Sequence, residues 1–227
     1  MAKRGVSPNK SNQIYCTVRE DIINGVYPGG TFITEGALCE QFSVSRTPVR
    51  EALIRLAQDR FVELIPNKGA IVPHVDIKDI VELYQLRMVN EGLAAALVAE
   101  SRSDALLQKL EASIQREEEL IQRGEDPLTI STEDFVFHDL IVRNCGNRRL
   151  VEVLELIDNQ MHRFARAAAD SHAIETLTCS AFHHRRALEA IRAGDREAAR
   201  TIIADHWQAM MNGYVRRNLA GTLPIQL

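Results

Sequence analysis

The stretch "VSRTPVREAL", residues 44–53, places a proline near the start of a predicted helix, with an arginine on each side of it. If Ser45 is the N-cap, Pro48 falls in the first turn, where backbone N–H groups lack intrahelical partners and proline costs little. Arg46 and Arg50 then lie on one exposed face. Positive charge opposes the helix dipole at this end, so the pattern predicts that an anion binds there. Solvated surface charge is the alternative for this segment taken alone.

The segments around this helix predict a winged helix-turn-helix. Apolar residues recur at helical spacing in three short segments: Ile14, Val18, Ile22, Leu38, Phe42, Val49, Leu53 and Leu56. The segments "FVELI" and "AIV", separated by "PNKG", then predict two antiparallel strands. The turn between them carries Lys68 and Gly69, a cation and a glycine that would let the backbone approach a phosphate.

Beyond residue 75 the sequence predicts almost nothing but helix. Helical patterns with short connections cover about 76–99, 103–123, 131–144, 148–169, 175–193 and 195–219. Six such helices predict an antiparallel bundle. The expected fold is therefore mainly α, with a disordered tail at 1–10, a winged helix-turn-helix domain at 11–75 and an all-helical domain at 76–222.

Composition narrows the class of protein. The 227 residues are 45% hydrophobic and 26% charged, with a net charge of −4, as in an ordinary globular protein. The first 75 residues carry nine Lys and Arg against seven Asp and Glu, which gives weak support to a basic N-terminal domain. No apolar run reaches the roughly 18–20 residues of a membrane span, and no secretory signal is evident. Four distant cysteines favour reduced thiols, so we expect a cytoplasmic protein with no membrane partner.

A second set of polar residues is predicted to face the helical core. Asp134 and His138 are four residues apart and leave the same helix face. His184, rather than His183, shares a face with apolar residues of its helix, and so does His206. Three imidazoles and a carboxylate suit a divalent ion, with zinc or nickel favoured over magnesium. A histidine on an apolar face is more often a hydrogen-bonded core residue, so that alternative stays open.

The segment "GVYPGGTFITEGALCEQFSVSRTPVREALIRLAQDRFVELIPNKGAIV" resembles the DNA-binding domain of GntR-family bacterial transcription regulators. The likeness covers about residues 11–73. It implies that Arg46, Thr47 and Arg50 touch DNA, next to Ser45, and that Lys68 and Gly69 do so from the wing. Gly36 stands where some relatives carry a DNA-contacting arginine, so that contact should be absent.

The region from about Asp76 to Leu219 is similar to the effector domain of the FadR-type branch, called FCD. The likeness lies in the placement of Asp134, His138, the "GN" and "GD" turns, His184 and His206. It implies that these four residues hold a metal ion and that a small carboxylate effector binds beside it. Arg87, in "LRMVNE", could hold that carboxylate, although an Arg87–Glu91 helical ion pair is an equal alternative. Six helices match the shorter, VanR-like form.

The expected protein is a homodimeric, ligand-responsive regulator, with repression as the working mode of action, bound to a pseudo-palindromic operator in double-stranded DNA. The rival function is a metal-dependent hydrolase or lyase that uses the same Asp/His cluster. That rival lacks an evident general base, since only Glu133 and Glu189 are available and neither has supporting spacing. A third alternative is a metal-free regulator whose histidines are only packed or hydrogen-bonded.

Overall fold

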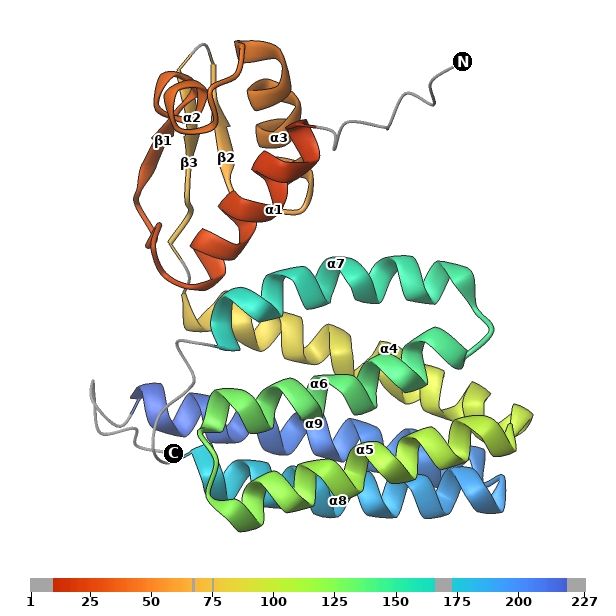
Figure 1. The fold of residues 1–227 in the computed structure, drawn as a ribbon. Helices are drawn as coiled ribbons and strands as arrows, with labels where there is room; N and C mark the ends of the chain where they lie inside the picture. The colour runs from red at the N-terminus through yellow and green to blue at the C-terminus, as the bar shows by residue number, and fades with distance from the viewer. Residues whose placement is uncertain (1–9, 67, 75, 166–172, 220–227) are drawn as a thin grey trace, which may run out of the picture. The chain divides into compact units, whose positions relative to one another are not determined.

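A computed structural model of the protein describes residues 10–66, 68–74, 76–165 and 173–219. Figure 1 shows that the chain is predominantly helical, which confirms the predicted fold class. The chain divides into two compact units: the first comprises the described residues up to His74 together with His162–Phe164, and the second comprises the other described residues from Asp76 onward. The predicted tail lies outside the described residues except for Lys10, which begins the first helix.

The first unit contains three helices and three short strands: α1 (Lys10–Ile23), β1 (Phe32–Thr34), α2 (Glu35–Phe42), α3 (Arg46–Gln58), β2 (Glu63–Ile65) and β3 (Gly69–Ile71). The apolar residues that the sequence placed inward form its core, together with Ile33, Phe61 and Val62, except that Phe42 is only partly buried against that core. Thr34 caps α2, since its hydroxyl accepts a hydrogen bond from Ala37 N at 3.1 Å.

The sheet of this unit has one strand more than the sequence predicted. Its order is β1-β3-β2, and both outer strands are antiparallel to β3. Ala70 on β3 is paired with Ile33 on one side and Leu64 on the other. β1 is only three residues long and buries Ile33 alone, so its sequence shows no alternation that would reveal a strand.

The second unit contains six helices among its described residues, as predicted: α4 (Ile77–Ser101), α5 (Asp104–Arg123), α6 (Pro127–Asn144), α7 (Arg148–Ala165), α8 (Ala173–Ala193) and α9 (Arg196–Leu219). α6 starts four residues earlier than predicted. Asp126 caps it by accepting hydrogen bonds from Leu128 N and Thr129 N, both at 3.1 Å, and Pro127 occupies the first turn at little cost. The predicted extension of α7 to 169 lies outside the described residues.

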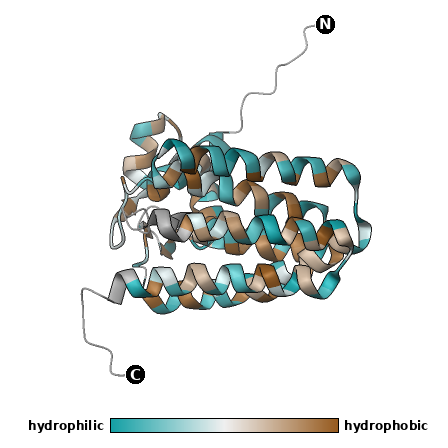
Figure 2. Ribbon diagram, turned by 90° about the horizontal axis from the view of Figure 1, so that it is seen from below, coloured by the Kyte–Doolittle hydropathy of each residue, from teal (hydrophilic) through white to brown (hydrophobic). Residues whose placement is uncertain are grey.

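The helices of this unit run side by side as a bundle, and each carries both polar and apolar residues (Figures 1 and 2). α4 and α9 approach closely because Gly92 has no side chain: a Cβ there would lie 3.1 Å from the carbonyl oxygen of Arg200. Buried alanines of α4 and the fully buried Trp207 of α9 fill the neighbouring core. Among the described residues, no helix is both long and apolar enough to cross a membrane.

Candidate functional site

The start of α3 presents the residues predicted to contact DNA. Ser45, Arg46, Thr47 and Arg50 are all exposed, whereas Val49 is fully buried beneath them. Ser45 has the extended backbone of an N-cap, but its hydroxyl makes no capping hydrogen bond. The backbone N–H groups of the first turn are therefore not occupied by the Ser45 hydroxyl and can donate to another acceptor, as expected of an anion-binding helix end.

Arg50 is held in place by an acidic residue of the preceding helix. Its Nε donates to Glu35 Oε1 at 2.8 Å, and its side chain remains 52% exposed. This ion pair raises the pKa of Arg50. Because only Nε is engaged with Glu35, the terminal nitrogens of the guanidinium can face a ligand outside the unit.

The wing residues differ from one another in their surroundings. Lys68 is exposed, whereas Gly69 is buried and has φ +143°. A Cβ at position 69 would lie 2.1 Å from the carbonyl oxygen of Ile33, so the backbone of β1 excludes any side chain there. Gly69 thus has a packing role that the sequence did not reveal, in addition to the DNA contact predicted for it. Gly36 is exposed on α2, and a Cβ added there would have no neighbouring atom within 4 Å.

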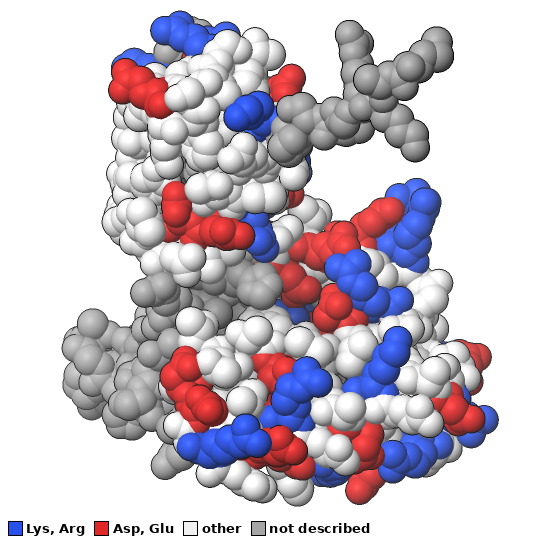
Figure 3. Space-filling view, viewed as in Figure 1, with Lys and Arg blue, Asp and Glu red and all other residues white. Residues whose placement is uncertain are grey.

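Charge is distributed differently on the surface of each unit. Figure 3 shows basic side chains gathered at one end of the first unit, with a few acidic side chains beside them. On the same face of the bundle, both signs are interspersed. The mixed charge on this face of the bundle offers no extended patch of one sign, whereas the grouped basic side chains of the first unit suit a polyanion.

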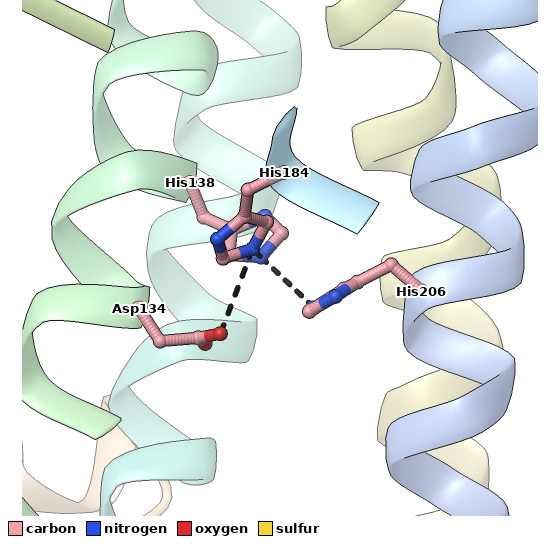
Figure 4. Close-up of side chains that lie close together, drawn as sticks. All are labelled: Asp134, His138, His184 and His206. Carbon is pink, nitrogen blue, oxygen red and sulfur yellow. Dashed lines mark hydrogen bonds and ion pairs between the residues drawn. The ribbon is translucent and has the colours of Figure 1, made fainter. Parts of the chain in front are cut away.

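The four predicted metal ligands come together inside the bundle. Asp134 and His138 extend from α6, His184 from α8 and His206 from α9, and their side chains meet in Figure 4. One donor atom of each lies within 4.8 Å of the others, and none of the four residues is more than 2% exposed. His184 is the inward histidine of its pair, as predicted, and His183 is partly exposed.

The Nε2 atoms of the three histidines converge on one another. His138 Nε2 lies 3.0 Å from His206 Nε2 and 3.1 Å from His184 Nε2. Oδ1 of Asp134 lies 3.5 Å from His184 Nε2. Two donors bound to one ion at about 2.1 Å would be about 3.0 Å apart at a right angle and about 3.4 Å apart in a tetrahedral site. These separations therefore fit a shared divalent ion.

Two buried carboxylates contact the opposite edges of these rings. Glu91 Oε2 lies 2.5 Å from His138 Nδ1 in a bent contact, and Glu117 Oε2 lies 2.8 Å from His184 Nδ1. Such partners fix the orientation of a ligating imidazole and leave its other nitrogen for the metal. The Ser180 hydroxyl, in turn, donates a hydrogen bond to Asp134 Oδ1.

Burial controls the protonation of the cluster. Desolvation lowers the pKa of His184 to about 4 and that of His138 and His206 well below the usual value, so the imidazoles are neutral at pH 7. Desolvation raises the pKa of Asp134 to about 6 and that of Glu117 to about 8. Neutral imidazoles are the form that binds a metal, and a cation among these acids would favour their ionised form.

A hydrogen-bonded cluster without metal is also compatible with these distances. The single lone pair of His138 Nε2 could accept a hydrogen bond from His206 Nε2, or share a bifurcated one with His184 Nε2 if protonated Glu117 donates to His184 Nδ1. In that arrangement His206 Nδ1 is a buried acceptor that has no hydrogen-bond partner. A buried polar atom without a partner is costly. A metal on His206 Nε2 would leave Nδ1 protonated and equally unpartnered, so this atom does not separate the two alternatives.

Arg87 forms the helical ion pair that the sequence offered as an alternative to effector binding. Its Nε donates to Glu91 Oε1 at 2.6 Å, and an Nη atom pairs with Asp158 Oδ1 at 2.9 Å. The guanidinium lies 4.0 Å from the centre of the Trp207 ring. Arg87 is 1% exposed, yet its Nη1 has no hydrogen-bond partner. The ion pair and a further acceptor at Nη1 are therefore compatible.

The outer residues of this cluster were not predicted from the sequence. Glu117 follows Leu106, Leu110 and Ile114 on the buried face of α5, and an acidic residue in such a stripe was the available signal. Glu91 was noticed only as a partner of Arg87. Ser180 gave no signal, because nothing in the sequence places α8 opposite Asp134.

The comparisons with known proteins agree with this architecture. Residues 10–72 match the model described as "Bacterial regulatory proteins, gntR family", and residues 82–209 match the FCD domain. The chain belongs to the GntR family, in its FCD branch. Its relatives include an uncharacterized HTH-type transcriptional regulator, YdhC, of Bacillus subtilis, which is 30% identical over 86% of each chain. Another is the gluconate operon transcriptional repressor of Bacillus licheniformis, 30% identical over 67% of this chain and 62% of that one.

Solved structures of other proteins have the same fold as this GntR-family chain. Escherichia coli McbR/YncC covers 94% of the chain with a TM-score of 0.71 and 22% identity, and all of that protein is matched. A GntR regulator from Rhodococcus sp. RHA1 covers 95% of the chain and 99% of its own, with a TM-score of 0.72 and 23% identity.

Family membership decides between the expected classes of function. GntR regulators with an FCD domain bind DNA and regulate transcription, and they are not enzymes. The hydrolase or lyase alternative is therefore wrong. The geometry offers a reason: Glu91 and Glu117 contact the Nδ1 atoms of the histidines, on the side of each ring opposite the converging Nε2 atoms, where neither is placed as a general base.

Proposed function

We propose that this protein is a cytoplasmic, dimeric repressor. Its affinity for a pseudo-palindromic operator would be changed by a small carboxylate bound beside a divalent metal. The observation that carries the proposal is the buried convergence of Asp134, His138, His184 and His206, drawn from three helices. Zinc or nickel suits three imidazoles and one carboxylate. When bound, the ion supplies a Lewis-acidic centre that attracts an anionic oxygen.

The DNA-binding domain, 11–75, would use the start of α3 and the wing. Arg46 and Arg50 project from an exposed helix end whose N-cap hydroxyl makes no capping bond, next to Ser45 and Thr47. Lys68 and Gly69 would add a contact from the wing. In a dimer, two such helices would reach half-sites about one helical turn apart, roughly 34–36 Å, or a multiple of it.

The effector domain, 76–222, would select a carboxylate through two attractions. One is the metal, and the other is Arg87, whose buried Nη1 has no hydrogen-bond partner. Glu91 pairs with Nε of Arg87, and Asp158 pairs with one of its Nη atoms. The effector carboxylate would therefore bind Nη1 through a single hydrogen bond rather than in the bidentate arrangement. A hydroxylated acid such as gluconate is a reasonable first probe, given the gluconate operon repressor among the relatives.

Such an effector would act only if it binds the DNA-competent and DNA-incompetent forms with different affinities. The first test is the metal content of full-length protein purified without chelator or affinity tag. We expect about one zinc or nickel per chain, and the double variant His138→Ala/His206→Ala should lose it. His183→Ala is the matched control, because this histidine is partly exposed and lies next to the cluster. Metal content far below one per chain in the wild type would favour the metal-free alternative.

The second test connects the metal to the effector. Thermal shift of the full chain would be measured with acetate, citrate and gluconate, each with and without added Zn²⁺ or Ni²⁺. Operator binding would then be measured by gel shift with each acid that stabilises the protein. We expect stabilisation to depend on the metal and to be lost in Arg87→Gln. An acid that stabilises the double histidine variant equally would contradict the proposed site.

A further inference from the structure

The buried carboxylate of Glu91 contacts three side chains that belong to both halves of the proposed effector site. Its Oε1 accepts a hydrogen bond from Arg87 Nε at 2.6 Å, and its Oε2 accepts one from Trp207 Nε1 at 2.9 Å. The same Oε2 lies 2.5 Å from Nδ1 of His138. Glu91 is fully buried, so no water competes for either oxygen.

We propose that Glu91 is a positioning residue that joins the metal site to the carboxylate site, by orienting His138 through one oxygen and Arg87 through the other. This inference rests on the proposed metal site. It adds to the four ligands a fifth residue whose removal should weaken metal binding without removing any ligand atom.

The contact with His138 determines which nitrogen of that ring faces the metal. The contact is too bent to be a hydrogen bond, and His138 Nδ1 has no hydrogen-bond partner among the described residues. A lone pair on Nδ1 would nevertheless repel the carboxylate oxygen at 2.5 Å, and Glu91 already accepts from Arg87 and Trp207. The proton therefore belongs to Nδ1 of His138, and Nε2 presents its lone pair to the cluster. Outer carboxylates of this kind typically change metal affinity by about 10–100-fold when removed.

The position of Trp207 strengthens this assignment. Its indole ring lies 4.4 Å, centroid to centroid, from the ring of His138 and 4.0 Å from the guanidinium carbon of Arg87. The indole N–H is a donor only, so it requires an acceptor when buried. Glu91 satisfies it at 2.9 Å. The carboxylate therefore fixes the indole, the imidazole and the guanidinium relative to one another.

Glutamine at position 91 keeps the size of the side chain but replaces one acceptor oxygen by an NH₂ group. It cannot accept from Arg87, Trp207 and His138 together. Loss of a negative charge alone would also weaken cation binding, so a control must remove the same charge. Glu133 provides it, because it is 8% exposed, adjoins Asp134, and contacts Ser113 and Arg116 rather than an imidazole.

The experiment measures Zn²⁺ affinity of full-length protein by competition with a chromogenic chelator. Wild type, Glu91→Gln and Glu133→Gln would be compared after circular dichroism shows that each is folded. We expect Glu91→Gln to bind Zn²⁺ at least about tenfold more weakly than wild type. Glu133→Gln should stay within about threefold. Equal affinities for the two variants would overturn the role of Glu91, whereas wild type that binds no Zn²⁺ would instead overturn the proposed metal site.

A spectroscopic readout separates orientation from general destabilisation. Co²⁺ substituted at the site reports its ligand field, and we expect its visible absorption spectrum to change in Glu91→Gln but not in Glu133→Gln. If Glu91→Gln does not fold, Trp207→Phe takes its place, since it removes one donor to Glu91 and keeps an aromatic ring. That variant should bind Zn²⁺ a few-fold more weakly with an altered Co²⁺ spectrum. An unchanged affinity and spectrum would contradict the inference.

Discussion

The two candidate sites differ in how they relate to the protein interior. In the first unit, Ser45, Arg46, Thr47 and Arg50 are exposed at the start of one helix. In the bundle, the Asp/His cluster is contributed by three helices, and each member is at most 2% exposed. One site is a local feature of the chain, and the other exists only when distant helices pack.

This difference has an energetic origin. An exposed arginine remains hydrated, so it needs no specific partner within the unit. Its guanidinium therefore stays available to bind a ligand such as DNA. A buried imidazole or carboxylate must be hydrogen-bonded, neutralised or bound to a metal. The bundle accordingly surrounds its cluster with Glu91, Glu117 and Ser180. At the start of α3, by contrast, the described contacts give Arg50 a single acidic partner, Glu35.

The largest expected effect concerns the exposed site. Arg46→Ala/Arg50→Ala should weaken operator binding roughly 100-fold or more, because two guanidinium contacts to DNA are lost. The thermal stability of the protein should change little, since both side chains are exposed. Gel shift and circular dichroism would measure the two quantities.

A matched control for this variant is Arg148→Ala/Arg149→Ala. It removes the same charge from exposed positions at the start of α7, where both arginines pair with Glu152. Operator affinity should be nearly unchanged in the control. If the two double variants weaken binding equally, net charge rather than α3 explains the result, and the assignment of this helix to DNA is wrong.

Gly69 in the wing tests whether the first unit, whose candidate site is exposed, also contains a position that accepts no side chain. Gly69→Ala would bring a Cβ to 2.1 Å from the carbonyl oxygen of Ile33, at φ +143°. We expect it to destabilise the first unit by at least about 2 kcal/mol. Amide hydrogen exchange of β1 and β3 in the full chain would report the loss.

Gly36→Ala is the opposite case in the same unit. Gly36 lies in α2 with open space around it, so alanine should raise the helix propensity and stabilise the unit by up to about 1 kcal/mol. Equal protection of β1 and β3 in Gly69→Ala and Gly36→Ala would show that β1 can move away from the wing, and the steric role of Gly69 would be lost.

The smallest effect concerns the buried site and appears as a dependence on pH. Burial raises the pKa of Glu117 to about 8, so between pH 4.5 and 8 the folded protein holds a proton that the unfolded chain has released. The free energy of unfolding of metal-free protein should therefore fall by on the order of 1 kcal/mol from pH 7 to pH 9. The lower pKa values of Asp134, about 6, and His184, about 4, place their titration below this window.

Glu117→Gln should remove most of that fall, because the amide has no proton to release. Glutamine at the exposed Glu119 should leave it unchanged. Urea denaturation of chelator-treated protein at the two pH values gives the measurement. A wild-type protein equally stable at pH 7 and pH 9 would mean that Glu117 is ionised without a metal.

Much of the fold was predictable from periodicity and caps. The six bundle helices were found because each has apolar residues at helical spacing and a short connection. The strand β1 was missed, since Phe32–Thr34 gains its structure by pairing with β3, which lies far along the chain. The α6 start was placed late because the Asp126 cap and Pro127 precede the apolar pattern.

The sequence by itself determined the parts of this protein that depend on neighbouring residues. The start of α3 and the direction of His184 both follow from local spacing, because helix geometry converts spacing directly into a shared face. Packing decided the rest. Only when α4, α5, α6, α8 and α9 come together do Glu91 and Glu117 reach the imidazoles, since hydrogen bonds between helices depend on distances that no single segment encodes.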